Sequence, residues 1–213
     1  MVMKNSITIL LTALYILTNT LVSGAVEQRK AVPLKQGVLL IATPKLEDPH
    51  FIHTVILVVS YGGEGAFGLI INRPSGIDLK KIFPYLDGIA DSAFPVYLGG
   101  PVQQDSMSIL FTTDTPPEGA KKISENLYFA YDKNILVPAL QHSNQNNKIR
   151  IYAGSAGWAH GQLEHEIMSG AWLTIEANQD IIFTENPFKI WPSVFPIRTD
   201  DNLVQLDVRK LKK

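Results

Sequence analysis

Residues 53–71 read HTVILVVSYGGEGAFGLII, and this stretch decides the fold class. His53–Tyr61 is rich in β-branched residues, and a second such run, Ala66–Ile71, follows the turn Gly62-Gly63-Glu64-Gly65. β-Branched side chains favour strands, and a short glycine-rich connection between two strands favours a hairpin. The pattern therefore predicts two antiparallel strands that pair across this turn.

Short apolar runs elsewhere in the chain predict further strands. Val38–Ala42 is closed by Thr43-Pro44, and Pro74 is expected to end the second hairpin strand because proline has no N–H to donate. The remaining predicted strands are Val96–Leu98, Met107–Thr112, Leu127–Tyr131, Lys148–Ala153 and Trp172–Ile175.

Three segments are predicted to be helical. Asp78 is a suitable N-cap for a helix over Leu79–Leu86. Ile135–Leu140 is predicted to be helical in spite of Pro138, and Gln162–Met168 forms the third helix. The predicted apolar face of the first helix consists of Leu79, Ile82, Phe83 and Leu86.

The composition is that of a globular protein with one domain. Of 213 residues, 46% are hydrophobic and 18% charged, which excludes a mainly disordered chain. The 19 Lys and Arg nearly balance the 20 Asp and Glu, so the formal net charge is -1. This balance argues against direct nucleic-acid binding. The absence of Cys excludes disulfides, Cys-ligated zinc, iron–sulfur clusters and thiol catalysis.

The first 25 residues have the layout of a signal peptide. Lys4 is followed by the apolar run Ile7–Val22 and then by the small residues Ser23-Gly24-Ala25. Cleavage there would place the mature protein outside the cytoplasm, in the periplasm or secreted. The alternative is an uncleaved membrane anchor, but the run is near the short end for crossing about 30 Å of hydrocarbon. After cleavage no stable membrane anchor is expected, because no Cys is present to accept a lipid.

Gly154–Ile167 carries the residues with the clearest chemical interest. If helical, this stretch puts Glu164 inside the apolar arc formed by Leu163 and Ile167, with His160 one turn earlier on the same side. A carboxylate in that position needs a partner, whereas His165 and Glu166 are expected to point elsewhere. The glycines at 154, 157 and 161 indicate tight turns or close backbone approach around Trp158.

This segment resembles the signature of the AlgH/YqgE family, in which Gly-Trp, two further residues, and Gly-Gln-Leu-Glu are followed by a second Glu. The resemblance covers roughly residues 37–195 in the family's order. Its other parts are Gly37–Ala42 with Asp48-Pro49-His50-Phe51, Gly68–Pro74, Tyr97–Val102, Ala171-Trp172-Leu173 and Trp191.

The resemblance implies an α+β fold: a single compact domain whose curved or barrel-like, mostly antiparallel sheet is flanked by helices. Together with the leader and the composition of the two ends, it divides the chain into a signal peptide over 1–25, an N-terminal extension over 26–36, the family domain over 37–197 and a polar basic tail over 198–213. Members are often labelled transcriptional regulators, and the family brings no settled reaction or ligand. Members are generally regarded as cytoplasmic, so the leader departs from the pattern and the cytoplasm is the alternative localisation.

Arg73 is a candidate anion-binding residue, because at the end of a strand its guanidinium can hold a carboxylate or a phosphate. The same side chain could instead form a static ion pair with Glu164. The full set of candidate ligand-binding residues is Asn72, Arg73, Gly99, Gly100, Trp158, Gln162 and Glu164.

The sequence predicts a binding domain without catalytic activity, whose partner is an unknown small ligand or another protein. One alternative is a hydrolase-like enzyme that uses Glu164 with Arg73 or His160 as an acid–base pair. Ser155 lies in Gly-Ser-Ala-Gly, which is not a nucleophile elbow, so no nucleophile motif supports that alternative. The other alternative is the family's regulator label, which requires a cytoplasmic protein whose DNA affinity falls steeply with salt.

No metal site and no cofactor are predicted. His160, Glu164 and His165 match neither the His-Glu-x-x-His spacing of zinc proteases nor its inverted form. On a helix, the two histidines would also point in different directions.

Overall fold

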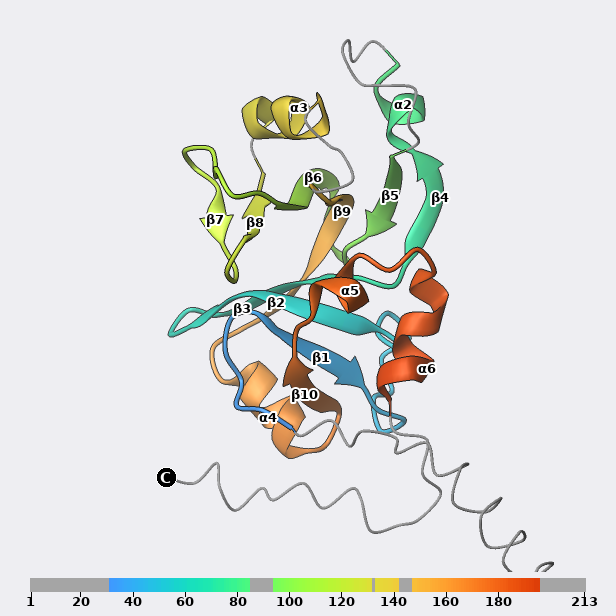
Figure 1. The fold of residues 1–213 in the computed structure, drawn as a ribbon. Helices are drawn as coiled ribbons and strands as arrows, with labels where there is room; N and C mark the ends of the chain where they lie inside the picture. Colours follow the sequence, from blue (N-terminus) through green and yellow to red (C-terminus); the bar gives the residue numbers. More distant parts are fainter. Residues whose placement is uncertain (1–30, 85–93, 132, 142–146, 196–213) are drawn as a thin grey trace, which may run out of the picture.

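The computed structural model describes residues 31–84, 94–131, 133–141 and 147–195 (Figure 1). The predicted signal peptide over 1–25, residues 26–30 of the predicted extension and the 198–213 tail lie outside these residues. Across the described residues, no helix combines the length and apolar character needed to cross a membrane.

Ten strands form one curled sheet in the order β10-β1-β2-β3-β9-β6-β8-β7, with β4 beside β5 and β5 beside β9. All neighbouring pairs are antiparallel except β5 and β9, which run parallel. The fold is therefore the expected single α+β domain built on a mostly antiparallel half-barrel. The strands are β1 (Val38–Ala42), β2 (Val55–Gly62), β3 (Gly65–Ile70), β4 (Pro74–Asp78), β5 (Pro95–Leu98), β6 (Val102–Thr112), β7 (Lys121–Lys122), β8 (Leu127–Ala130), β9 (Ile149–Trp158) and β10 (Trp172–Glu176).

The predicted hairpin is confirmed as β2 and β3, which pair from Ile56↔Ile70 to Gly62↔Gly65. Val55–Val59 of β2 are fully buried, because β2 lies between β1 and β3 and is covered on both faces. A continuous β-branched run suits a strand in this position.

Strand β9 joins the two halves of the sheet. Its first half pairs with β6 and, on its other edge, with β5, while its last residues pair with β3. The change of neighbour occurs at Gly154, whose φ of 71° suits glycine. There the chain at Gly99 and Gly100 passes so close that a Cβ on Gly99 would lie 2.2 Å from the carbonyl oxygen of Gly154.

Three apolar clusters hold helices against the sheet. The largest includes Ile182 of α5 and Ile190 and Val194 of α6, the second includes Leu163 of α4, and the third contains side chains from α2 and α3. The helices are α2 (Leu79–Ile82), α3 (Lys133–Gln141), α4 (Gln162–Met168), α5 (Gln179–Ile182) and α6 (Ile190–Val194), with a 3-10 turn η1 (Pro187–Lys189) before α6.

Several local predictions need correction. Pro74 begins β4 rather than simply ending the hairpin, because a fixed proline φ is compatible with the first residue of a strand. Helix α2 is capped by Asp78 as predicted but ends at Ile82, and both Ile82 and Phe83 are exposed. Strand β9 continues to Trp158, so Gly157 lies in a strand and not in a turn. No sequence pattern predicted α5, η1 or α6.

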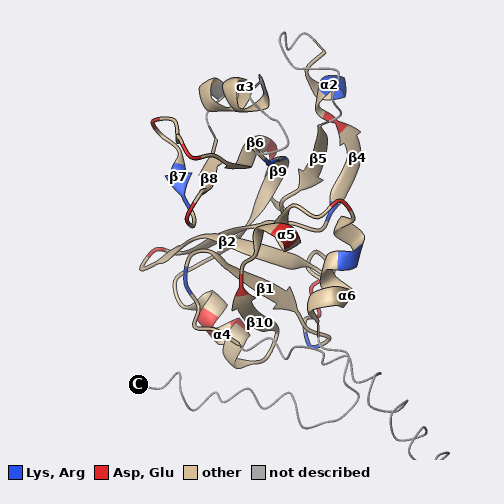
Figure 2. Ribbon diagram, viewed as in Figure 1, with Lys and Arg blue, Asp and Glu red and all other residues tan. Residues whose placement is uncertain are grey.

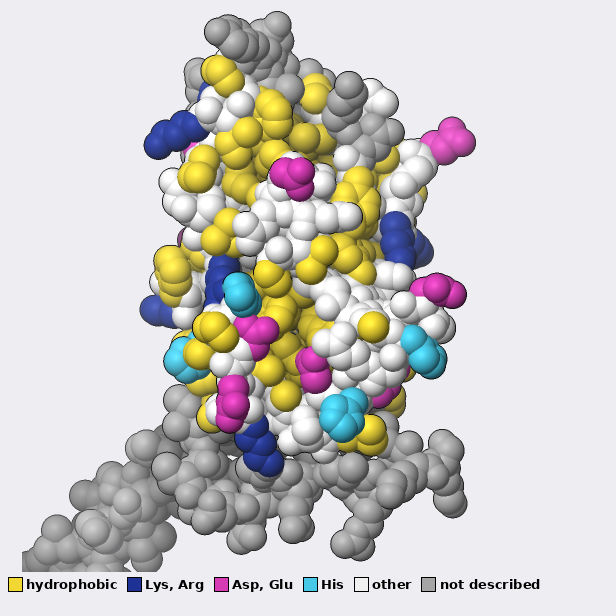
Figure 3. All heavy atoms as spheres, turned by 180° about the vertical axis from the view of Figure 1, so that it is seen from behind, with side chains coloured by type: hydrophobic (Ala, Val, Ile, Leu, Met, Phe, Trp, Pro, Cys, Tyr) yellow, Lys and Arg dark blue, Asp and Glu magenta, His cyan; other side chains and the backbone are white. Residues whose placement is uncertain are grey.

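The face opposite α5 and α6 exposes hydrophobic side chains, which gather mainly over its upper half (Figure 3). Exposed hydrophobic residues of β4, β5, β6 and the α2 region include Ile77, Ile82, Phe83, Leu98 and Val102.

Candidate functional site

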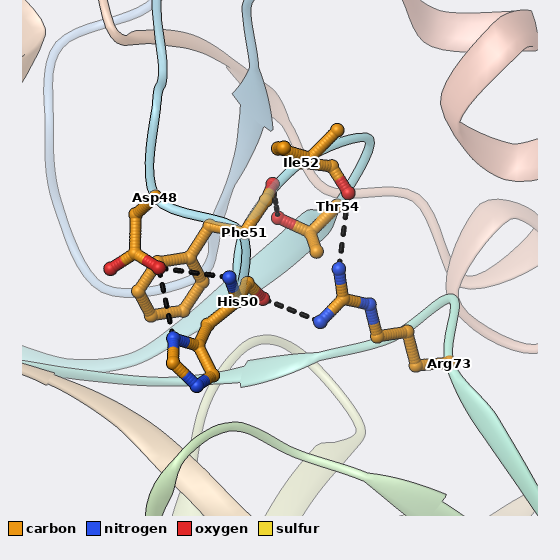
Figure 4. Close-up of polar contacts among 6 residues, drawn as sticks. All are labelled: Asp48, His50, Phe51, Ile52, Thr54 and Arg73. Carbon is orange, nitrogen blue, oxygen red and sulfur yellow. Dashed lines mark hydrogen bonds and ion pairs between the residues drawn. The ribbon is translucent and has the colours of Figure 1, made fainter.

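The loop between β1 and β2 is held by the residues that follow β3 (Figure 4). Arg73 donates from Nη1 to the carbonyl oxygen of His50 at 2.5 Å and from Nη2 to that of Ile52 at 3.1 Å. Asn72, which is buried, donates to the carbonyl oxygen of His53 and accepts from the backbone N–H of Val55, both at 2.9 Å. Two neighbouring side chains thus fix the backbone of residues 50–55.

Asp48 and Thr54 fix the same loop from within. One oxygen of Asp48 accepts from the backbone N–H of His50 at 2.8 Å and lies 2.9 Å from His50 Nδ1. The Thr54 hydroxyl donates to the carbonyl oxygen of Phe51 at 2.7 Å. We call residues 48–54 the Asp48–Thr54 loop.

His53 is held in an uncommon backbone conformation. Its φ of 56° lies in the left-handed region, which is strained for most residues other than glycine. The centroid of its ring lies 4.3 Å from the ring centroid of Trp191, a residue of α6. The indole N–H of Trp191 donates to the carbonyl oxygen of Ala42 at 2.8 Å. Packing against α6 and the Asn72 hydrogen bond hold His53 in place.

Arg73 lies partly out of solvent. Burial lowers the pKa of its guanidinium, and the negative charge of Asp48 opposes that shift. An arginine remains a cation in proteins, so the loop is held by a charged donor that the carboxylate of Asp48 partly balances.

A second group of residues joins β9, α4 and β10. Oε2 of Glu166 accepts the indole N–H of Trp158 at 2.9 Å and that of Trp172 at 2.7 Å. Oε1 accepts from Nε2 of Gln162 at 2.9 Å, and Gln162 Oε1 accepts from the backbone N–H of Ala159 at 3.1 Å. One carboxylate thereby fixes α4 against two strands.

Phe51 connects this group to the Asp48–Thr54 loop. Its ring stacks on Trp158 at 6.3 Å between centroids and meets the edge of Trp172 at 5.8 Å. We call Phe51, Trp158, Trp172 and Glu166 the tryptophan cluster. Segments that are far apart in the sequence thus form one continuous assembly.

The structure corrects the predicted environment of Glu164. Glu164 accepts from the Tyr61 hydroxyl at 2.7 Å, and this hydrogen bond is the main cause of the raised pKa of Tyr61. His160 precedes α4 and is exposed, and Arg73 is engaged with the loop. Among the described residues, neither Glu164–Arg73 nor Glu164–His160 forms an ion pair or a hydrogen bond. Glu166, which was expected to point elsewhere, is the carboxylate that accepts hydrogen bonds from Trp158, Trp172 and Gln162.

The other candidate residues are also occupied by internal contacts. Gly99 donates to the carbonyl oxygen of Ala153 at 2.8 Å and accepts from the N–H of Ile70 at 2.9 Å. A Cβ on Gly100 would lie 2.2 Å from the backbone of Ser155. Both glycines therefore pack backbone against backbone. Within the described residues, no group of three or more His, Asp and Glu side chains could hold a metal ion.

Sequence reasoning named Asn72, Arg73, Trp158 and Gln162 but missed Glu166 as the shared acceptor. The motif Asp48-Pro49-His50-Phe51 was the available signal for the loop. Acidic and basic residues are interspersed along the ribbon of the described residues, and no continuous run of basic residues is visible in this view (Figure 2).

The described residues form a single small α+β domain built on a curled half-barrel, and sequence comparison gives its family. The AlgH-like family model matches residues 39–197, so the chain belongs to the AlgH-like family. A UPF0301 protein of Thioalkalivibrio sulfidiphilus is 36% identical over 155 residues, which cover 71% of this chain and 83% of that protein. A UPF0301 protein of Chlorobaculum tepidum is 33% identical over 159 residues, covering 74% of this chain and 83% of the relative.

Solved structures agree on the fold. The solution structure of the AlgH protein from Pseudomonas aeruginosa superimposes with a TM-score of 0.62 at 32% identity, covering 77% of this chain and 89% of that one. A crystal structure of a Corynebacterium diphtheriae protein gives a TM-score of 0.65 at 22% identity, covering 79% and 91%. The second likeness concerns the fold alone.

Proposed function

We propose that this chain is a non-catalytic binding domain whose Asp48–Thr54 loop contacts another protein. The observation that carries the proposal is a contrast between backbone and side chains in this loop. Arg73 and Asn72 fix the backbone, while Ile52 is 44% exposed and the His50 side chain is 62% exposed. A rigid loop that presents an apolar side chain beside polar ones loses little conformational entropy on binding.

The geometry argues against the hydrolytic alternative. An acid–base pair must lie within hydrogen-bond reach of each other or of the reacting atoms. Glu164 is bonded to Tyr61, and Arg73 is bonded to two backbone carbonyl oxygens. The polar atoms of the tryptophan cluster are likewise satisfied within the cluster and by Gln162, as expected of residues that stabilise a fold.

Two variants test the loop as a contact surface. Ile52→Asp places a charge on the loop, and Ile77→Asp makes the same change on β4, where Ile77 is 45% exposed. Both variants are expected to fold like the wild type. Affinity capture with quantitative mass spectrometry should identify proteins that Ile52→Asp loses and Ile77→Asp retains. Identical recovery with the wild type and both variants would refute the loop as the contact surface.

We further propose that the protein is exported, on the strength of Lys4, the Ile7–Val22 run and Ser23-Gly24-Ala25. Cell fractionation with N-terminal sequencing tests this. A mature chain that begins at or near Val26 outside the cytoplasm would support export and exclude direct transcriptional control. An intact Met1 in the cytosol would contradict export and favour the regulator alternative, whose DNA affinity would then be measured against salt.

A further inference from the structure

Arg150 of β9 is a buried cation that lacks a carboxylate partner. The residue is only 6% exposed. Its Nη1 donates to the carbonyl oxygen of Ile71 at 2.8 Å, and its Nη2 donates to that of Thr184 at 2.5 Å. No carboxylate of the described residues lies within ion-pair distance of its guanidinium. Both of these acceptors are neutral, so no negative charge balances the buried guanidinium among the described residues.

Tyr152 lies two residues further along the same strand and on the same face. Its hydroxyl is fully buried and has no hydrogen-bond partner among the described residues. The Tyr152 ring lies 5.7 Å from that of Tyr97, and the Arg150 guanidinium carbon lies 4.5 Å from the centre of the Tyr97 ring. A buried hydroxyl without a partner is rare in native proteins and calls for a physical explanation.

The buried charge beside the Tyr152 hydroxyl is positive. Burial raises the pKa of Tyr152 to about 12, while the positive charge of Arg150 and its close approach to the hydroxyl lower it. Lys148 is a second cation at this end of β9, and its nearest acid is Asp180 at 3.6 Å, which is mostly exposed. Phe183 lies 6.0 Å from both the Lys148 and the Arg150 charge centres. The positive charge of Arg150 and the O–H donor of Tyr152 thus occur together, next to the residues that follow α5.

We propose that Arg150 and Tyr152 bind a small carboxylate anion. A carboxylate supplies the negative charge that Arg150 lacks and an acceptor for the Tyr152 proton, and its planar shape matches the guanidinium fork. The rings of Tyr97 and Phe183 lie 4.5 and 6.0 Å from the guanidinium carbon, so the proposed ligand has few atoms. Thr184, one of the two carbonyl partners, follows Phe183, the C-cap of the four-residue helix α5. The site is separate from the Asp48–Thr54 loop and does not depend on the proposed function.

The test uses the full protein and formate as the probe. Thermal unfolding is followed in sodium formate and in sodium chloride at equal ionic strength, and binding is followed by the NMR signal of ¹³C-formate. We expect formate to raise the unfolding temperature of the wild type. In Tyr152→Phe the affinity for formate should fall about tenfold, the size expected for one hydrogen bond to a charged group. Tyr128→Phe is the matched control, because Tyr128 is a buried tyrosine of the third apolar cluster, which contains side chains from α2 and α3. This variant should behave like the wild type.

Three outcomes would overturn the proposal. One is an equal response of the wild type and Tyr152→Phe to formate. The second is no formate response in the wild type together with a stability gain in Tyr152→Phe, which would mean that the hydroxyl is simply unpaired or bound to water. The third is stabilisation by inorganic phosphate but not by formate, which would exclude the carboxylate class. Arg150→Lys keeps the positive charge but removes the paired N–H donors of the guanidinium. This variant should therefore also bind formate more weakly.

Discussion

Trp158 and Trp172 come from different strands and donate their indole N–H groups to the same oxygen, Oε2 of Glu166. Their rings meet edge to face at 6.0 Å. We predict that Glu166→Ala destabilises the protein by roughly 2–3 kcal/mol, because three donors lose a charged acceptor. Urea unfolding monitored by tryptophan fluorescence would measure the change.

Glu164→Ala is the control for this prediction. It lies on the same helix and removes a single hydrogen bond from the exposed Tyr61, so its cost should stay below about 1 kcal/mol. Equal costs for the two variants would mean that Glu166 does not have the structural role assigned to it.

These two carboxylates show how far the sequence could predict the site. Helix α4 begins and ends where its apolar spacing predicted, at Gln162 and Met168. Periodicity gives the face of a residue relative to its own helix, but it does not say which distant donors that face meets. The acceptor role of Glu166 depends on β10, which brings Trp172 alongside α4, and no local pattern contains that contact.

Asn72→Ala is predicted to open the Asp48–Thr54 loop locally. The change removes the acceptor of the buried Val55 N–H and the donor to the His53 carbonyl oxygen. The expected cost is roughly 2–3 kcal/mol. Hydrogen exchange should accelerate at the amides of residues 51–55 while the β6–β8 amides keep their protection. Uniform acceleration across both regions would contradict a local role for Asn72.

The crossing of Gly99 over β9 gives a prediction about backbone packing. A Cβ on Gly99 would lie 2.2 Å from the Gly154 carbonyl oxygen. Because both are backbone groups of paired segments, neither can move away without breaking other contacts. Gly99→Ala should therefore cost roughly 4 kcal/mol or more. Gly62→Ala is the matched change, because nothing lies within 4 Å of its Cβ position, and it should leave the unfolding midpoint almost unchanged. If chemical denaturation finds similar midpoints for both variants, the close crossing is wrong.

The strands were more predictable than the elements that connect and cover them. Apolar runs specified β1, β2 and β3, because β1, Val55–Val59 of β2 and the last three residues of β3 are buried. Strand β4 pairs irregularly with β5, and its residues Ser75-Gly76 have low strand propensity. Helices α5 and α6 contain four and five residues, too few to show a helical period. Their positions depend on contacts with the large apolar cluster.

Tyr152 leads to a prediction about stability at alkaline pH. Its pKa is raised to about 12 in the folded protein by burial, against 10.0 for an ordinary tyrosine. Between these values the folded protein holds a proton that the unfolded chain releases, so unfolding becomes easier as pH rises. The contribution of this proton to the free energy of unfolding is fully present below about pH 10. It is lost as the pH rises towards 12, at roughly 1 kcal/mol per pH unit. Tyr152→Phe has no such proton, and its free energy of unfolding should fall less steeply over this interval. Urea unfolding at pH 9, 10, 11 and 12 compares the two slopes, and parallel curves would show that Tyr152 is not buried as described.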